Sequence, residues 1–503
     1  MSAVRHPPAW LIALLLVLGF AFQGTRAIWE PDEGRYSTVA LNMISSGDWL
    51  VPTIDGEHPH LTKPPVTYWA IAGGVLLLGQ NEWGARLPGA LAFFGTGLLL
   101  FGLGRRFCPA RPWLPPLVYA TSLAPFMAAT VISTDVLLVF FETAAMYAFV
   151  RAFHPFGEPD RSWVRAMWAL WGLAFMTKGP PGLLPLLAMA AMLATSRKQS
   201  LRALFDPLGL LAFAAIGFTW FGAIVAQDPS RLGYFLGYEV YDRVFTATHG
   251  RNSEWYAPLT VYGPVFLFGA LPWWPLALAA AGGPRGGWRE FRDRLRARDR
   301  DWLLLAWWLL LPLAIFCLAR SRLQLYVTPL FVPLALVMAR SLSHGAWLGT
   351  RRLAAIAGIS AVTLVTLKGV VGSVHVDRDA REMAAALRPV VESRGLEEIV
   401  FVNMRPFYGL HMYLPVEVEG VQIDEHRWEY SRFVAEEDLC GEVSRHENNV
   451  YAMKENRGER FVGAVARCDG YAATSAGHFE ADGNRIVLFS VDETGHRPPP
   501  AEH

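Results

Sequence analysis

The chain has 503 residues, of which 53% are hydrophobic and 18% are charged, and its formal net charge is +1. A soluble protein of this length carries more charge, and its apolar residues do not gather in runs of about 20, the length that crosses a bilayer. The composition therefore excludes a soluble protein and indicates a polytopic membrane protein, and nothing in the charge pattern indicates a nucleic-acid partner.

The first apolar run, Ala9–Phe22, follows Arg5 and could be read as the core of a secretory signal. No small-x-small cleavage site precedes Ile28 and further runs follow, so we expect an uncleaved anchor and not a removed signal peptide. The further runs predict membrane-spanning helices at Leu87–Gly104, Leu114–Val131, Val136–Phe153, Leu208–Val225, Pro258–Ala281, Trp302–Leu318, Leu325–Met338 and Leu353–Val371.

The segment Pro65–Leu78 decides the topology, because counting it as a span inverts the orientation of every later span and loop. It is short, begins with two prolines and contains a Gly-Gly pair, which suits a helix in the membrane interface as well as one that crosses. If it does not cross, the cytoplasmic loops carry nineteen Lys and Arg residues, seven of them within Gly282–Asp301, as the positive-inside rule requires. We therefore expect eleven spans, a cytoplasmic N-terminus and a first outer loop over residues 30–83.

The tail after about Val374 differs in kind from the rest of the chain. Residues 375–503 hold 24 acidic and 14 basic residues. "DAREMAAALRPVVESRG" predicts an amphipathic helix, and "EIVFVNM", "MYLPVEVEGV", "RFVGAVARC" and "NRIVLFSV" predict strands. We expect a membrane domain over 1–374 and a small outer α/β domain over 375–503, where Cys440 and Cys468 could pair in an oxidising compartment or stay free.

Under this threading, the polar residues of several motif-like stretches, next to or within the apolar runs, fall at the outer face. Ionisable groups near hydrocarbon are costly and usually mark a functional cavity. Six separate stretches reach this face, so we expect them to line one cavity, and they are Asp32–Arg35, Lys63, Asp135, Lys178, Arg243 and Arg320–Tyr326.

The first of these stretches combines an acidic pair with nearby cations. A carboxylate can take a proton from an attacking hydroxyl as a general base. Guanidinium and ammonium groups can hold a phosphate and stabilise it as it leaves. The residue types therefore suit a reaction between a phosphate-bearing lipid and a hydroxyl acceptor.

Several motifs resemble the GT-C superfamily of polyprenyl-phosphate-sugar-dependent glycosyltransferases, and in particular the bacterial aminoarabinose transferases that modify lipid A, which are related to the protein O-mannosyltransferases. The resemblance covers most of the chain. It is carried by "EPDEGRYSTVALNMISSGDWLVPTIDG", "KPPVTYWAIAGGVLLLGQNEWGARLPGAL", "STD", "LAFMTKGPPGLLPLL", "VFTATHGRNSEWYAP", "FGALPWWPLAL" and "RSRLQLYVTPLFVPLAL".

The resemblance implies a GT-C fold of about eleven transmembrane helices plus juxtamembrane helices, with a small periplasmic α/β domain. It implies an enzyme of the bacterial inner membrane with a periplasmic site, an undecaprenyl-phosphate sugar donor, a glycolipid acceptor such as lipid A, and inversion at the anomeric carbon. Carried over to this chain, Asp32 is the catalytic base with Glu33 as its partner or substitute. The implied substrate-binding residues are Arg35, Lys63, Asp135, Lys178, Arg243, Arg322 and Tyr326.

The chain departs from the family pattern at three places. Thr62 precedes Lys63 where the family has an acidic, possibly metal-binding residue, Val240 and Tyr241 replace a His-Asn pair, and "SRLQLY" replaces Ser-Lys-Leu-Pro-Thr-Tyr. We therefore assign no metal ligand and no required cofactor. A divalent metal ion stays an alternative, in which His58 and His60 would be the ligands.

The sequence also leaves structural alternatives open. Asp32 and Glu33 could serve only to stabilise the first turn of the following helix. Roles at the membrane edge or at a helix start are the alternatives for Lys63, Asp135, Lys178, Arg243 and Arg322. The rival functions are transfer of the sugar to protein Ser or Thr, transport of a lipid-linked sugar, and a non-catalytic scaffold.

Overall fold

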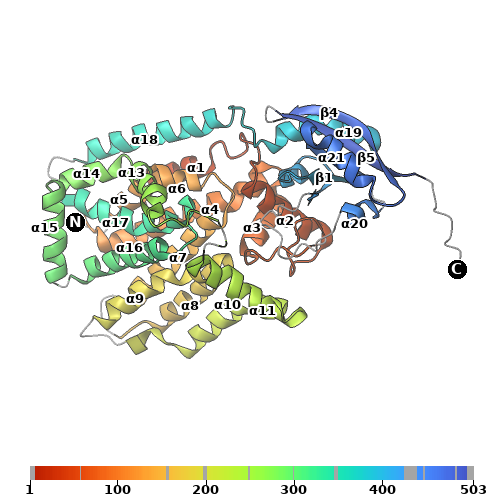
Figure 1. Cartoon of the computed structure of the whole chain (residues 1–503). Coiled ribbons are helices and arrows are strands. Elements are labelled where there is room, and N and C mark those ends of the chain that lie inside the picture. Colours follow the sequence, from red (N-terminus) through yellow and green to blue (C-terminus); the bar gives the residue numbers. More distant parts are fainter. Residues whose placement is uncertain are drawn as a thin grey trace. The chain divides into compact units, whose positions relative to one another are not determined.

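The computed structural model describes residues 6–494 apart from 57, 154–157, 196–200, 247, 249, 298, 345–348, 424–438, 446–447 and 482–483. The chain divides into two compact units, whose elements are labelled in Figure 1. Unit 1 comprises Met1–Gln23, Thr62–Ala70 and Arg86–Val371, and unit 2 comprises Gly24–Leu61, Ile71–Ala85 and Gly372–His503.

Unit 1 is built from helices. They are α1 (Ala9–Phe20), α4 (Glu82–Phe107, whose first residues belong to unit 2), α5 (Leu114–Ala120), α6 (Leu123–Ala128), α7 (Thr134–Ala152), α8 (Arg161–Lys178), α9 (Leu184–Ala194), α10 (Pro207–Gln227), α11 (Arg231–Gly233), α12 (Arg243–Phe245), α13 (Gly263–Gly269), α14 (Trp273–Ala280), α15 (Gly283–Arg296), α16 (Arg300–Leu318), α17 (Phe331–His344) and α18 (Thr350–Val371). Between α11 and α12 the chain forms a π-helical segment, Tyr234–Asp242.

Polar caps set where four of these helices begin. The side chains of Ser133, Asp160, Asp206 and Asp299 accept hydrogen bonds from backbone N–H groups in the first turns of α7, α8, α10 and α16. Such bonds satisfy N–H groups that have no partner within the helix. The start of α7 is therefore set by Ser133, and the Asp135 carboxylate is left for another partner.

The core of unit 1 is apolar and closely packed. Helix α17 lies beside both α5 and α14 (Figure 1). The indole N–H of buried Trp273 donates to Thr121 Oγ1 at 2.9 Å, so the tryptophan satisfies its only donor inside the core. Helices α10 and α18 instead expose large apolar side chains, such as Leu211 (64% exposed) and Ile359 (70%), as a lipid-facing surface does.

Five helices among the described residues are long and apolar enough to cross a membrane, and the pair Pro258–Gly269 and Trp273–Ala280, bent by 77°, gives a sixth if it counts as one span. Other expected spans are short or broken: α1 has 12 residues, and the run Leu114–Val131 divides into α5 and α6. The chain is a multi-pass membrane protein with several apolar helices, and the count of eleven stays a prediction.

Unit 2 contains a five-stranded sheet in the order β2-β1-β3-β5-β4. Strand β1 (Glu398–Val402) is parallel to β2 (Glu417–Val421) and β3 (Asn449–Lys454), and β5 (Asn484–Glu493) is antiparallel to β3 and β4 (Tyr471–Ala481). Helices α19 (Ala380–Arg394), α20 (Leu439–Val443) and α21 (Gly458–Val465) complete the domain. The predicted α/β character is confirmed, as are the predicted helix over 379–395 and the strands that became β1, β2 and β5.

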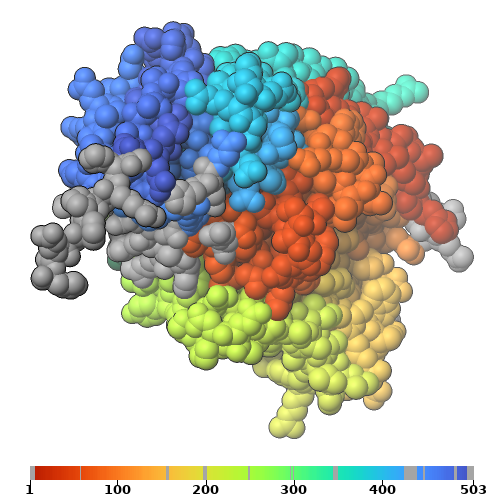
Figure 2. Space-filling model, turned by 90° about the vertical axis from the view of Figure 1, so that its right-hand side faces the viewer, coloured from red at the N-terminus to blue at the C-terminus, as the bar shows by residue number. Residues whose placement is uncertain are grey.

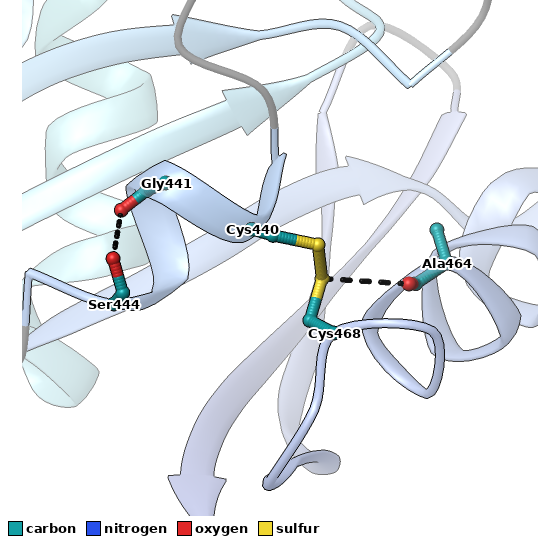
Figure 3. Close-up of a disulfide and its surroundings, with 5 residues drawn as sticks. All are labelled: Cys440, Gly441, Ser444, Ala464 and Cys468. Atoms are coloured by element: carbon teal, nitrogen blue, oxygen red, sulfur yellow. Dashed lines mark hydrogen bonds between the residues drawn. A yellow bond between two sulfur atoms is a disulfide. The ribbon is translucent and has the colours of Figure 1, made fainter.

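One predicted strand is wrong. The segment "RFVGAVARC" lies mostly in α21, because Phe461, Ala464, Val465 and Cys468 are all buried and recur at helical spacing. Strands β3 and β4 were not predicted. Cys440 and Cys468 form a disulfide, with Cys440 on α20 and Cys468 just after α21 (Figure 3). Of the predicted alternatives for these cysteines, the bonded one is confirmed.

The loop after α1, residues 24–61, packs within unit 2 against the sheet domain. Helix α2 (Asp32–Ser46) follows residues 24–31, and the later part of α3 (Val66–Leu78) also belongs to this unit. The backbone N–H of Glu30 donates to the carbonyl of Arg378 at 3.0 Å, and Thr38 Oγ1 donates to the carbonyl of Tyr408 at 2.5 Å. Figure 2 shows the red surface of the loop beside the blue surface of the sheet domain.

Candidate functional site

The predicted acidic pair lies in the first turn of α2, and its two members have different environments. Glu33 is 2% exposed, and its two carboxylate oxygens accept hydrogen bonds from Arg26 at 2.7 and 2.5 Å. The backbone N–H of Trp29 donates to the same carboxylate at 3.0 Å, and the Arg26 guanidinium lies 4.2 Å from the centre of the Trp29 ring. Glu33 therefore holds the chain that leads into α2.

Asp32 has the opposite environment. Its side chain is 55% exposed, and it forms an ion pair with Arg35 one turn further along α2. The Arg35 side chain is 12% exposed and lies against the Tyr36 ring. Asp32 is therefore an acid of this stretch that solvent can reach, and it has a cation beside it.

Glu30 is a third acid in this stretch, and the sequence reading did not single it out. It is 6% exposed, and its Oε1 accepts a hydrogen bond from the backbone N–H of Gly409 at 2.5 Å. Burial raises the pKa of this carboxyl to about 8, against the opposing effect of the Gly409 hydrogen bond and of Arg35. A Cβ on Gly34 would overlap the Glu30 carboxylate, so the glycine makes room for this contact.

A second group of predicted residues lies in unit 1. The Lys63 ammonium is 3.8 Å from Glu239 Oε2, and the Arg243 guanidinium donates to the same oxygen at 2.6 Å. Tyr234 donates to the other oxygen at 3.1 Å. Glu239 therefore supplies a carboxylate next to Lys63 in a chain where Thr62 occupies the family's acidic position.

Burial lowers the pKa of Lys63 to about 7. Glu239 opposes this effect, whereas the neighbouring cations Arg243, Lys178 and Arg251 add to it. A buried lysine among other cations gains from an anionic partner, because the anion offsets both the desolvation and the repulsion.

Lys178, at the end of α8, belongs to the same group. It donates to Asp135 Oδ1 at 2.5 Å, and its ammonium lies 4.5 Å from the centre of the Tyr326 ring. Arg251 Nη1 donates to the Tyr326 hydroxyl at 3.5 Å. Lys178, Arg243 and Arg251 lie around Tyr326, and Lys63 lies next to Arg243. These four cations outnumber the carboxylates of Asp135 and Glu239 that pair with them, which makes the group a candidate anion site.

Arg322 is buried and binds backbone carbonyls. Its guanidinium donates to the carbonyls of Asn252, Glu254 and Cys317 at 2.8, 3.0 and 2.9 Å, and the residue is 4% exposed. These bonds hold the loop that contains Arg251 against the start of the segment leading to Tyr326. Arg322 therefore positions its neighbours, and its contact with a substrate stays a prediction.

The structure thus brings the predicted residues together in two groups. Asp32, Glu33 and Arg35 lie in unit 2, and Lys63, Asp135, Lys178, Arg243 and Tyr326 lie together in unit 1. The single cavity expected from the sequence stays a prediction. Sequence reasoning missed Glu239 and Arg251, although Glu239 precedes Arg243 by four residues, a spacing at which opposite charges on a helix meet.

The fold defines the class of the protein. It has the fold of a GT-C glycosyltransferase: it superposes on the crystal structure of ArnT from Cupriavidus metallidurans bound to undecaprenyl phosphate with a TM-score of 0.76, over 95% of this chain and 97% of that one, at 20% sequence identity. Residues 62–221 match the family described as dolichyl-phosphate-mannose-protein mannosyltransferase. The superfamily resemblance inferred from the motifs is confirmed.

Curated relatives are similar to this chain in amino-acid sequence. The chain is 31% identical over 318 residues to the undecaprenyl phosphate-alpha-4-amino-4-deoxy-L-arabinose arabinosyl transferase of Edwardsiella ictaluri, a match that covers 62% of this chain and 55% of the relative. It is also 31% identical over 339 residues to transferase 2 of the same description from Sodalis glossinidius, covering 66% and 58%. The chain therefore spans less than two thirds of the length of these relatives.

Proposed function

We propose that the protein is an inverting glycosyltransferase that moves a sugar from an undecaprenyl or similar polyprenyl phosphate to an acceptor hydroxyl. The acceptor is lipid A or another envelope glycolipid at the periplasmic face of the inner membrane. The observation that carries the proposal is the group of cations around Tyr326, since a lipid phosphate is the anion that such a group at a membrane edge can hold. The names of the aminoarabinose transferases to which the chain is similar support an undecaprenyl-phosphate-linked sugar as the donor.

Each residue has a role in one balanced step. Asp32 takes the proton from the acceptor hydroxyl, whose oxygen then bonds to the anomeric carbon of the donor sugar. The bond from that carbon to the phosphate oxygen breaks, and the polyprenyl phosphate leaves with the electron pair. Lys63, Lys178 and Arg243 stabilise the negative charge that develops on the phosphate.

The remaining predicted residues support this step. Asp135 orients Lys178, and Glu239 holds Lys63 and Arg243 next to each other. Arg35 pairs with the Asp32 carboxylate and orients it, and Glu33 fixes the start of α2 on which Asp32 lies. Arg322 and Tyr326 shape the phosphate site.

The proposal includes a topology. Eleven spans place the N-terminus in the cytoplasm, and the first loop over 30–83 and the domain over 375–503 in the periplasm. Two observations support this threading. Helix α3 has 13 residues, about 20 Å, which is short for a hydrocarbon core of about 30 Å. The disulfide between Cys440 and Cys468 suits an oxidising compartment.

Transfer to protein Ser or Thr is a second candidate, favoured by the family that matches residues 62–221, whose description names protein mannosyltransferases. Purified protein offered lipid A and an acceptor peptide, with the same donor, separates the two. We expect transfer to the lipid. Mass spectrometry of envelope lipids from cells with and without the gene gives the added mass and the molecule that carries it.

The proposed role of Asp32 as the general base is tested by Asp32→Asn. We expect this change to lower the transfer rate by a factor of about 100 to 10,000, since it removes a general base and keeps the size of the side chain. Asp48→Asn is the matched control, because Asp48 Oδ1 only accepts backbone hydrogen bonds from Leu50 and Val51, and an amide oxygen accepts them too. Full activity of Asp32→Asn in the same assay contradicts the assignment.

A further inference from the structure

A cluster of side chains with metal-ligand chemistry lies in unit 2, and it does not include the acids at the start of α2. It consists of Asp55 and His58 from the first loop and Glu419 from strand β2. One ligand atom from each residue lies within 4.8 Å of the other two, and His58 Nδ1 is 3.0 Å from Asp55 Oδ2. Carboxylate oxygens and an imidazole nitrogen are ligands that zinc and similar divalent ions accept.

The loop that carries Asp55 and His58 is held in a fixed shape. Thr53 and Pro59 form an isolated bridge, and the backbone N–H of His60 donates to the carbonyl of Pro52 at 2.6 Å. Within this closed loop, the backbone N–H of His58 donates to Asp55 Oδ1 at 2.7 Å. Asp55 is 7% exposed and the His58 side chain 14%. The two ligands are therefore oriented before any ion binds, which lowers the entropic cost of binding.

The third ligand of the cluster comes from an edge strand of the sheet domain. Strand β2 lies at one edge of the sheet, where Glu417 and Glu419, two residues apart, point to the same face. The Glu417 carboxylate lies against Gly56 of the loop, 3.1 Å from the position that a Cβ would take. Two carboxylates, Asp55 and Glu419, thus converge where the loop approaches the strand, with Glu417 near the loop backbone, and this negative charge favours a bound cation.

Other charged groups pack against the cluster. Arg445 contacts Glu419 at 3.4 Å and Glu442 at 3.8 Å, and Glu398, Glu419 and Glu442 form a second group of convergent carboxylates. That second group has only carboxylates and has Arg445 as a counterion, so we assign no metal ion to it. Glu419 has two oxygens, and one can face Arg445 while the other faces the loop.

We propose that Asp55, His58 and Glu419 bind one divalent transition-metal ion of the zinc type, which ties the first loop to the edge strand of the sheet domain. Tetrahedral ligand atoms around zinc lie about 3.3 Å apart, given metal–ligand distances of about 2.0–2.1 Å. His58 and Asp55 are already close to this spacing, and the Glu419 carboxylate, within 4.8 Å of both, can reach it by a rotation of its flexible side chain. A water molecule or a further oxygen ligand completes the coordination.

Zinc binding by the full-length chain tests the site. The chain is purified in detergent, its affinity tag is removed, and it is stripped with a chelator and titrated with zinc against a chromophoric competitor. We expect one zinc per chain, and zinc addition should raise the melting temperature. His58→Gln and Asp55→Asn should each weaken binding by a factor of about 10 to 100 or more, since they remove a ligand.

His60→Gln is the matched control, because His60 lies two positions away in the same loop and, unlike His58, is not among the three residues whose ligand atoms converge. It should bind zinc like the unmodified chain. Glu419→Gln tests the contribution of strand β2 to zinc binding. It also replaces a loop variant as the test if that variant fails to fold, which size-exclusion chromatography detects. Failure of the unmodified chain to bind one zinc overturns the proposal, as does equal loss in His60→Gln and His58→Gln. If Asp55→Asn and Glu419→Gln both keep the full affinity for zinc, these carboxylates are not ligands. The contact between His58 and Asp55 is then only a hydrogen bond, and the proposal is overturned.

Discussion

The three acids of the stretch from Glu30 to Glu33 differ in burial and in pairing. The partners that cause this lie outside the stretch, either far along the chain or a few residues before it. Glu30 is buried under Gly409, Glu33 is paired with Arg26, and Asp32 is exposed. The sequence could predict that the stretch is functional, since charges beside an apolar run are costly. It could not assign the roles, because a contact over 379 positions decides which acid is buried.

Glu30 predicts a pH dependence of stability. Its pKa is about 8 in the folded chain and 4.5 as an ordinary glutamate, so between these values the folded state binds the additional proton. The stabilisation is complete below pH 4.5 and is lost as the pH rises through 8. Each pKa unit corresponds to about 1.4 kcal/mol, so the loss is a few kcal/mol.

Glu30→Gln removes this titration and keeps an oxygen that can accept the Gly409 hydrogen bond. Relative to the unmodified chain, its melting temperature should therefore rise steadily between pH 5 and pH 8.5. Differential scanning fluorimetry in one detergent at matched ionic strength measures the difference. Glu459→Gln, an exposed acid on α21, should show a constant difference over the same range. A constant difference for Glu30→Gln as well would show that Glu30 is charged throughout.

At the scale of the element, α2 depends on a glycine inside a helix. Gly34 follows the acidic pair directly, and alanine would ordinarily be the better helix residue by about 1 kcal/mol. Here the Glu30 carboxylate occupies the space that a Cβ would need, and the Gly409 hydrogen bond restrains that carboxylate. The glycine is therefore explained by close packing and not by a turn.

Gly34→Ala should destabilise the protein by about 1–3 kcal/mol, the usual cost of overpacking a filled site. Thermal unfolding measures this, with Gly463→Ala in α21 as the control. Nothing lies within 4 Å of a Cβ at Gly463, so that change should be neutral or stabilising. In a Glu30→Ala background, Gly34→Ala should cost much less, because the clashing group is gone. Equal costs in both backgrounds would place the strain elsewhere.

The wrong strand assignment of "RFVGAVARC" has a physical cause at this same scale. Short apolar runs with β-branched residues fit a strand or a buried helix equally well. The buried residues Phe461, Ala464 and Val465 follow helical spacing, but this is visible only once it is known which face is covered. Predictions for longer or strictly periodic segments, such as α19, were confirmed.

At the scale of the whole molecule, hydropathy predicts membrane insertion well and the number of crossings less directly. Five described helices meet the length and composition of a span, whereas α1, α5 and α6 are short and the pair α13–α14 is bent. Prolines and glycines interrupt these segments, and neighbouring helices within the unit can satisfy the freed backbone groups. Helix length therefore gives five or six crossings among the described residues, and the higher count of eleven depends on the charges in the loops.

The proposed threading makes two loops differ in accessibility. Residue 110, in the connection after α4, should face the cytoplasm, and residue 385, on α19, should face the periplasm. Ala110→Cys and Ala385→Cys replace exposed alanines by a reactive thiol in a background with Cys317→Ser, while Cys108 is buried and Cys440 and Cys468 are bonded to each other. In intact spheroplasts, a membrane-impermeant maleimide should label Ala385→Cys within minutes and leave Ala110→Cys unlabelled until detergent is added. The reverse pattern would place the N-terminus outside, and the outer face that gathers Lys63, Lys178 and Arg243 would then lie in the cytoplasm, where a periplasmic acceptor cannot reach it.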